Sequence, residues 1–288
     1  NALPFWAMTP TLVFLAAGMS TRYGRLKQLE PVGPGGEALL DFGAFDAWRA
    51  GIPRILLVIR EELEEAFREH VEGRWPRELE VVFHHQTLEE LPEAQGLVRD
   101  SPGVAGAVED RRKPWGTAHA LLTARRHLSG PFVVLNADDF YGAGAFRQAV
   151  EFLGSGVPGE TRGRGDAASA DVRGSRNSVQ GVRGPTFGLV TYTLGDTLSE
   201  HGGVSRGIVE MDEEGWITGV REVLEIRETA GGVEGQGVEG GRIELTGEEA
   251  ISTNFWLFTP DVFPLLEAEL TPFLVAAGER WTLSPDAQ

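Results

Sequence analysis

Cysteine is absent from this chain of 288 residues, so disulfide bonds, thiolate zinc sites and cysteine nucleophiles are excluded. Long apolar runs are also missing, since no stretch approaches the roughly 20 residues that a membrane-spanning helix needs. Positive charge is scarce, because 26 Lys and Arg residues face 43 Asp and Glu residues, a formal net charge of −17. Nucleic acids and anionic membranes would repel so acidic a chain, and neither is expected as a partner.

The segment before Arg22 lacks lysine and arginine, and therefore lacks the basic start of a secretory signal peptide. We expect a cytoplasmic protein. We interpret residues 1–7 as an N-terminal extension ahead of a start at Met8.

Short apolar runs alternate with amphipathic segments through the first half of the chain. This alternation predicts a mainly parallel sheet with helices on both faces. The predicted strands are 10–16, 54–60, 78–83 and 131–136, and the predicted helices are 39–50, 61–71 and 117–128.

The second half has a different pattern, with predicted strands at 187–193, 206–211, 216–220 and 251–258. These indicate a mixed, partly antiparallel extension of the sheet. Residues 154–186 are rich in glycine and arginine and contain no aromatic residue, so they cannot bury enough apolar surface to offset their ordering entropy. We predict a mobile loop there, and we find no pattern in residues 281–288.

The stretch from Leu15 to Gly33, LAAGMSTRYGRLKQLEPVG, follows the first predicted strand and contains a glycine turn. A dinucleotide-binding turn needs G-x-G-x-x-G, and the second glycine is absent after Gly18. A P-loop needs G-x-x-x-x-G-K-[ST], but Gly18 to Gly24 is one residue too long and Arg25 follows. Both standard interpretations therefore fail.

The same turn still has the chemistry of a phosphate site. Gly18 can aim backbone N–H groups at an anion, and Ser20 and Thr21 add hydroxyl donors. Arg22 offers a planar fork for phosphate oxygens, and Lys27 offers a mobile point charge. The alternative is that both cations are solvated loop charges.

In sequence order, this stretch resembles the signature L-A-A-G-x-[GS]-[ST]-R, then lysine and P-V, of the sugar-phosphate nucleotidyltransferases (nucleotide-sugar pyrophosphorylases). The matching residues are Leu15, Ala16, Ala17, Gly18, Ser20, Thr21, Arg22, Lys27, Pro31 and Val32. The resemblance implies that 16–18, Ser20 and Thr21 bind nucleotide. It also implies that Arg22 neutralises the β- and γ-phosphates and that Lys27 bridges phosphates near the reacting centre.

A second segment, KPWGTAHA at 113–120, resembles the base-recognition segment of that family. The resemblance implies that Gly116 lets the nucleobase approach the backbone, with Thr117 at the helix start and Lys113 adding charge. The alternative is an ordinary helix start capped by Thr117. We expect His119 to pack or hydrogen-bond rather than catalyse.

A third segment, NADDFYG at 136–142, ends the predicted strand 131–136, and ligands of open α/β sheets bind at such strand ends. The family places its metal-binding aspartate here, which implies that Asp138 holds Mg²⁺ against phosphate oxygens. Asp139 is expected to cap the turn or accept a supporting hydrogen bond. The alternative is a simple Asp-Asp turn.

Weaker matches fall on the acceptor side, where the resemblance assigns Gly188, Glu222 and Asn254 to the sugar phosphate. The E-K-P that often surrounds the glutamate is absent from this chain. No aspartate that could serve as a second metal ligand precedes Asp261 in this region, so a metal site with one aspartate is expected, with Asn254 as a candidate helper.

The resemblance implies an α/β fold: a Rossmann-like three-layer sandwich of the nucleotide-diphospho-sugar transferase type, with a mainly parallel mixed sheet and a smaller antiparallel extension. One nucleotidyltransferase domain would span 8–288, with a nucleotide-binding half at 8–153 and a sugar-phosphate-binding half at 187–288.

The implied reaction joins an NTP and a sugar 1-phosphate into an NDP-sugar and pyrophosphate. Open alternatives are cytidylyl or molybdopterin-type transfer to a non-sugar acceptor, and a non-catalytic subunit that senses a nucleotide sugar. A homo-oligomer is left open.

Overall fold

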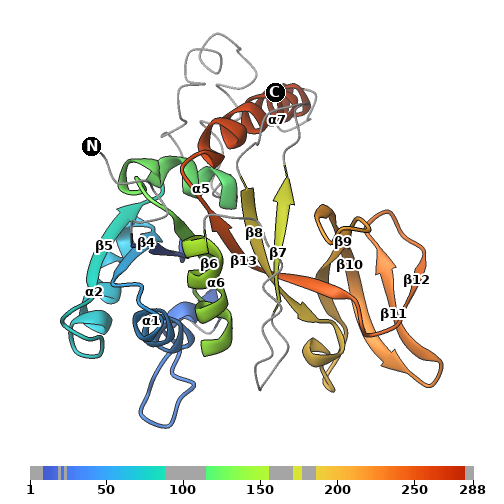
Figure 1. The fold of residues 1–288 in the computed structure, drawn as a ribbon, viewed down its shortest axis with the longest axis horizontal. Coiled ribbons are helices and arrows are strands. Elements are labelled where there is room, and N and C mark those ends of the chain that lie inside the picture. The colour runs from blue at the N-terminus through green and yellow to red at the C-terminus, as the bar shows by residue number, and fades with distance from the viewer. Residues whose placement is uncertain are drawn as a thin grey trace.

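The computed structural model describes residues 9–18, 21–22, 25–87, 115–155, 171–176 and 186–282. Within these ranges, one large mixed sheet runs through the protein, with helices on both of its faces at the N-terminal side (Figure 1).

Four parallel strands form the N-terminal part of this sheet. They are β1 (Thr11–Leu15), β4 (Arg54–Ile59), β5 (Glu80–His85) and β6 (Phe132–Asn136). β1 lies between β4 and β6, and β5 pairs with β4. Because all four strands run in the same direction, their C-terminal ends meet at one edge of the sheet, where loops can build a binding site.

Helices cover the two faces of these strands and create two separate cores. The helices are α1 (Leu39–Arg49), α2 (Glu64–Glu72), α5 (Thr117–Ala124), α6 (Ala143–Ser155) and α7 (Val262–Thr282). α1, α2 and α6 pack on one face, and α5 and α7 pack on the other. The strand side chains alternate accordingly, as Phe14 belongs to the first core and its neighbour Val13 to the second. The predicted three-layer sandwich is confirmed.

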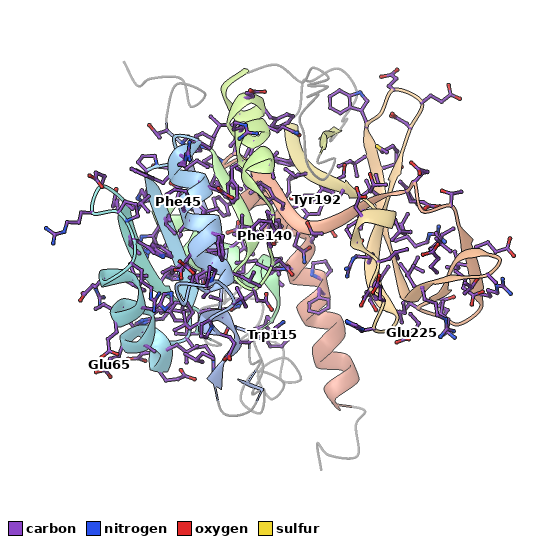
Figure 2. The ribbon with its side chains drawn as sticks, turned by 90° about the horizontal axis from the view of Figure 1, so that it is seen from below. Phe45, Glu65, Trp115, Phe140, Tyr192 and Glu225 are labelled. Atoms are coloured by element: carbon purple, nitrogen blue, oxygen red, sulfur yellow. The ribbon has the colours of Figure 1, made fainter. Side chains whose placement is uncertain are left out.

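The C-terminal part of the sheet is antiparallel. Its strands are β7 (Asp171–Arg176), β8 (Thr186–Thr193), β9 (Val204–Met211), β10 (Ile217–Thr229), β11 (Gly232–Gly237), β12 (Arg242–Leu245) and β13 (Ala250–Phe258). β13 joins the two parts, since it pairs antiparallel with β6, β8 and β9. Figure 2 shows Glu225 on this extension, at the opposite side of the molecule from Glu65 on α2. The predicted antiparallel extension is confirmed.

Two predictions for the second half need correction. Residues 154–155 complete α6, and residues 171–176 form β7, which pairs with β8, so the predicted mobile loop 154–186 contains regular structure. The remainder of that loop lies outside the described residues. α7 continues to Thr282, so residues 281–282 are helical where the sequence showed no pattern, and residues 283–288 lie outside the described residues.

Candidate active site

Lys27 and Asp138 meet at the C-terminal edge of the parallel strands. Lys27 begins a short 3-10 turn behind the glycine loop, and Asp138 lies two residues beyond the end of β6. Lys27 Nζ donates to Asp138 Oδ2 at 2.6 Å, although 111 residues separate the two in sequence. The fold therefore brings together a predicted phosphate-binding cation and the predicted metal-binding carboxylate.

The glycine loop leaves β1 at the same edge. Ala16 is buried, and its N–H donates to the Val58 carbonyl at 2.9 Å, while Gly18 is exposed. The buried Gln28 donates through Nε2 to the Gly18 carbonyl at 3.3 Å, which ties the loop to the turn that carries Lys27.

Arg22 lies in a two-residue strand, β2 (Thr21–Arg22), that pairs with β3 (Arg25–Leu26). This pairing places the Arg22 backbone next to β3, the strand that directly precedes Lys27. The side chains of Thr21 and Arg22, like Ser20 and Lys113 as a whole, lie outside what the structure describes.

A buried tyrosine fastens the turn that carries Asp138. Tyr141 OH accepts from the Asn136 N–H at 3.0 Å and donates to the Thr253 carbonyl of β13 at 3.1 Å. Burial, followed by the nearby Asp139 carboxylate, raises the pKa of Tyr141 well above its usual value, so the hydroxyl stays protonated. Asp139 Oδ2 accepts from Asn136 Nδ2 at 2.9 Å, which confirms the supporting role expected for this carboxylate.

The acceptor-side residues are distributed unevenly. Asn254 directly follows Thr253, is exposed and has a left-handed backbone (φ 63°) within a bulge of β13. The Tyr141 hydrogen bond at Thr253 therefore places Asn254 beside the end of β6. Glu222 of β10 pairs with Gly207 of β9, and Gly207 pairs with Ser252 of β13. Glu222 is therefore aligned across the sheet with the residue at which the β13 bulge begins.

Gly188 lies elsewhere. It pairs with Leu257, which pairs with Val133 near the start of β6, about 10 Å along that strand from Asn136, the last residue of β6 before the turn that carries Asp138. A Cβ at this position would come within 2.7 Å of Leu257 and 2.9 Å of Phe152. Close packing accounts for this glycine, and the structure does not bring it to the Lys27–Asp138 pair.

The base-recognition segment is the start of α5. Gly116 is the N-cap residue, with φ 105°, and no atom lies within 4 Å of where a Cβ would stand. Thr117 is the first helical residue, so the alternative in which Thr117 caps the helix is wrong. His119 is fully buried and hydrogen-bonded, as expected, through Nδ1 to Gln86 Nε2 at 2.9 Å.

Sequence reasoning missed Gln86 and Tyr141. Gln86 directly follows β5, and the C-terminal end of a parallel strand was a signal that could have found it. Tyr141 could not be singled out, because its role depends on a carbonyl 112 residues away.

The donor set at Asp138 suits a hard divalent cation. Magnesium takes one or two protein carboxylates and completes its octahedral shell with water and phosphate oxygens. Within the described residues Asp138 makes one hydrogen bond, through Oδ2, which leaves Oδ1 without a partner there. No cluster of three or more histidine, aspartate or glutamate side chains that could hold a metal alone occurs in the described parts of the chain.

Comparison with known proteins identifies the class. Residues 13–155, about half of the chain, match the family model described as nucleotidyl transferase. This half of the chain belongs to the nucleotidyl transferase family, and the protein is a nucleotidyltransferase. No curated protein sequence matches significantly. None of the helices within the described ranges has the length and apolar character needed to cross a membrane.

Three solved structures illustrate the similarity. UDP-glucose pyrophosphorylase from Acinetobacter baumanii is 17% identical, with 94% of this chain and 81% of that chain covered and a TM-score of 0.44. HddC from Yersinia pseudotuberculosis is 14% identical, with 88% and 79% covered and a TM-score of 0.45. Inositol-1-phosphate CTP transferase from T. maritima is 14% identical, with 90% and 74% covered and a TM-score of 0.44.

Proposed function

We propose that this nucleotidyltransferase joins an NTP to a sugar 1-phosphate and releases pyrophosphate. The observation that carries the proposal is the contact between Lys27 Nζ and Asp138 Oδ2 at 2.6 Å. The Lys27 ammonium group and the Asp138 carboxylate, which is suited to Mg²⁺, lie next to each other. Together they can bind the two sides of a single phosphate group. Such an arrangement supports nucleotidyl transfer, because the reaction depends on positioning and charge neutralisation rather than on a covalent intermediate.

In the proposed reaction, an oxygen of the sugar phosphate attacks the α-phosphorus and pyrophosphate leaves on the opposite side. Lys27 exchanges its bond to Asp138 for phosphate oxygens near the reacting centre, and Arg22 neutralises the β- and γ-phosphates of the leaving group. Mg²⁺ bound by Asp138 would supply Lewis-acid neutralisation of the α-phosphate.

The remaining predicted residues have supporting roles. The open backbone at Gly116 lets a nucleobase pack against the start of α5. Asn254 contacts the sugar phosphate, since it stands beside the end of β6. Glu222 hydrogen-bonds the sugar hydroxyls, and Lys113 adds charge near the nucleotide.

The experiment is a pyrophosphate-release assay across a grid of NTPs and acceptor phosphates, in the presence of Mg²⁺. We expect turnover with at least one sugar 1-phosphate. Turnover confined to an alcohol phosphate would replace the sugar acceptor by a non-sugar one. Binding of a nucleotide sugar without pyrophosphate release from any pair would contradict catalysis and favour a sensing subunit.

A further inference from the structure

The backbone of β13 is left unpaired where the two halves of the sheet meet. β8 pairs along one edge of β13, so β9 and β6 share the other edge, with Ser252 paired to β9 and Trp256 paired to β6. Thr253 and Asn254 lie between these contacts and are also skipped by the ladder to β8, which makes them a bulge. Among the described residues, sheet pairing therefore does not fix this bulge relative to the end of β6.

One peptide group of the bulge is held by two hydroxyl groups instead. The Thr253 carbonyl oxygen accepts from Tyr141 OH at 3.1 Å. The N–H of Asn254, which belongs to the same peptide group, donates to Ser252 Oγ at 3.2 Å. Because a peptide group is planar, fixing both its C=O and its N–H fixes its orientation. The left-handed backbone of Asn254 (φ 63°) is thereby held, and with it the direction of an exposed side chain.

Tyr141 reaches this peptide group from the turn that carries Asp138. Its buried hydroxyl accepts from the N–H of Asn136, the last residue of β6, at 3.0 Å. The hydroxyl has a single proton, and the Thr253 carbonyl oxygen at 3.1 Å is nearer than Asp139 Oδ2 at 3.5 Å, so the hydroxyl donates to Thr253. One buried oxygen atom therefore bridges the end of β6 to the bulge of β13, at the gap that the sheet ladder leaves.

We infer that Tyr141 is a positioning residue whose hydroxyl sets the distance between the turn of Asp138 and the side chain of Asn254. The inference rests on the proposed function, which places the α-phosphate at Asp138 and the sugar phosphate at Asn254. In-line attack requires the acceptor oxygen to line up with the α-phosphorus, and a misplacement of about 1 Å can cost about a hundredfold in rate. Each substrate binds to its own side of the bridge, so loss of the bridge should affect turnover much more than binding.

The first measurement compares turnover with binding in Tyr141→Phe, at a temperature where circular dichroism shows the variant to be folded. We expect kcat for pyrophosphate release to fall by about 10- to 100-fold. The calorimetric dissociation constant of each substrate alone should change by less than about threefold. Tyr192→Phe is the control, because it removes a neighbouring buried hydroxyl and leaves the bridge intact, and its kcat should stay within about threefold of the wild type. A purely structural role of Tyr141 would give a normal kcat in the folded variant, and that result would overturn the inference.

The second measurement asks whether Tyr141 acts through Asn254. Asn254→Gly removes the side chain and keeps a residue that adopts the left-handed backbone without cost. In this background Tyr141→Phe should lower kcat by less than about threefold, because the group that the bridge positions is already gone. An equal loss in both backgrounds would show that the two residues act independently and would contradict the inference.

The third measurement does not depend on activity. The amide hydrogen of Asn254, followed by NMR, should exchange at least about threefold faster in Tyr141→Phe than in the wild type, while the amides of 256–258 in the paired part of β13 keep their rates. Unchanged exchange at Asn254 would mean that Tyr141 does not hold the bulge.

The two proposals fail separately. If the wild type releases no pyrophosphate from any pair of substrates, the proposed function is wrong, whatever the exchange rates show. If pyrophosphate is released and the bulge loosens, but kcat of Tyr141→Phe is normal, the proposed function holds and the positioning role of Tyr141 is wrong.

Discussion

The ion pair of Lys27 and Asp138 contributes little to the stability of the fold. The Lys27 side chain is 43% exposed and that of Asp138 is 29% exposed, and exposed pairs are worth only about 0–1 kcal/mol. A surface pair of this kind is readily exchanged for another partner. The contact between Lys27 and Asp138 therefore costs little free energy to break, and an entering triphosphate can replace it.

Replacing Lys27 by alanine separates activity from stability. We expect Lys27→Ala to lower kcat by about 10²- to 10³-fold, because a charge donor aimed at the transferring phosphate is lost. Denaturant unfolding should show a free-energy change below about 1 kcal/mol. Arg68→Ala on α2, which removes a distant exposed cation, is the control and should leave kcat near normal. A normal rate for Lys27→Ala would mean that Lys27 is a solvated loop charge.

Tyr141 connects the end of β6 with the bulge of β13. Tyr141→Phe removes the hydroxyl that accepts from Asn136 and donates to Thr253, so a part-buried N–H and a part-buried carbonyl lose their partner. We expect a loss of about 1–3 kcal/mol in the free energy of unfolding, measured by urea titration. Tyr192→Phe removes one hydrogen bond, to the Tyr141 carbonyl, and should cost less. An equal cost for the two variants would contradict this assignment.

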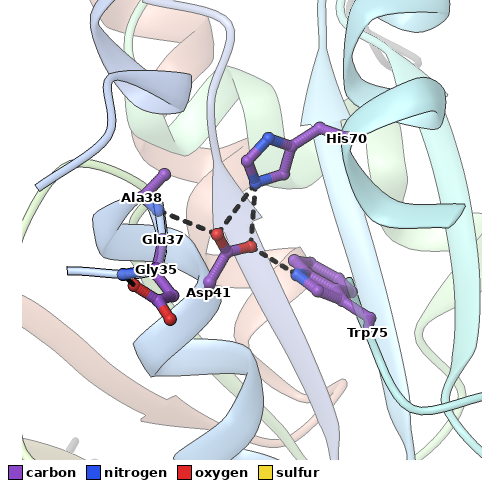
Figure 3. Close-up of polar contacts among 6 residues, drawn as sticks. All are labelled: Gly35, Glu37, Ala38, Asp41, His70 and Trp75. Atoms are coloured by element: carbon purple, nitrogen blue, oxygen red, sulfur yellow. Dashed lines mark hydrogen bonds and ion pairs between the residues drawn. The ribbon is translucent and has the colours of Figure 1, made fainter. Parts of the chain in front are cut away.

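At the scale of the elements, a buried carboxylate anchors the first helix. Asp41 in the first turn of α1 accepts hydrogen bonds from the Ala38 N–H at 2.8 Å and from Trp75 Nε1 at 2.6 Å, and His70 Nε2 lies 2.9 Å away (Figure 3). One side chain thereby joins the start of α1 to α2 and to the loop beyond it. This start follows directly on the loop that carries Lys27.

Removing this carboxylate should loosen three segments together. We expect Asp41→Ala to cost about 2–4 kcal/mol of unfolding free energy, because two buried N–H groups and the part-buried His70 ring lose their partner. Asp46→Ala on the same helix is the control, since Asp46 is only partly buried. Thermal unfolding measured by circular dichroism checks both variants, and similar melting temperatures for the two would show that the cluster is unimportant.

The face between β5 and α5 carries a histidine that resists protonation. Burial, followed by the charge of Arg126 and the nearby His127, lowers the pKa of His84 from 6.5 to about 4. The unfolded chain therefore binds more protons than the folded chain between these values. The stability contribution is complete above pH 6.5 and is lost as the pH falls toward 4.

The shifted pKa of His84 makes the free energy of unfolding depend measurably on pH. We expect the unfolding free energy to fall by up to about 3 kcal/mol between pH 6.5 and 4 on account of His84. His84→Gln, which can keep a hydrogen bond to Thr123 without titrating, should show a smaller fall over the same range. Urea titrations at several pH values test this, and identical slopes for the variant and the wild type would contradict it.

At the scale of the whole molecule, the parallel half was predictable and the antiparallel half only in part. Buried strands such as Arg54–Ile59 carry continuous apolar runs, and their helices have clear periodicity. α6 was not predicted, although its buried residues Ala145, Phe146 and Ala149 follow helical spacing. β11 and β12 are short and half-exposed, and β11 contains glycine, so their pairing depends on neighbours that local sequence does not reveal.

In the candidate site, too, some features could be predicted from the sequence and others could not. Lys27, Asp138 and Gly116 could be named from motifs, because each stands at a strand end or a helix start. The contact between Lys27 and Asp138 could not be predicted from spacing, since it depends on the order of β1 and β6 in the sheet. The close packing of Gly188 against Leu257 and Phe152 could likewise not be predicted from its local sequence.

The central claim is that Asp138 organises metal-dependent nucleotidyl transfer, and its neighbour provides a matched control. Mg²⁺-dependent pyrophosphate release should be measured for Asp138→Asn and Asp139→Asn under the same conditions, with the NTP and sugar 1-phosphate that the wild type prefers. Both variants remove one negative charge from the same turn. We predict a loss of at least about a hundredfold for Asp138→Asn and of less than about tenfold for Asp139→Asn. Full turnover of Asp138→Asn, or equal losses in the two variants, would contradict the account.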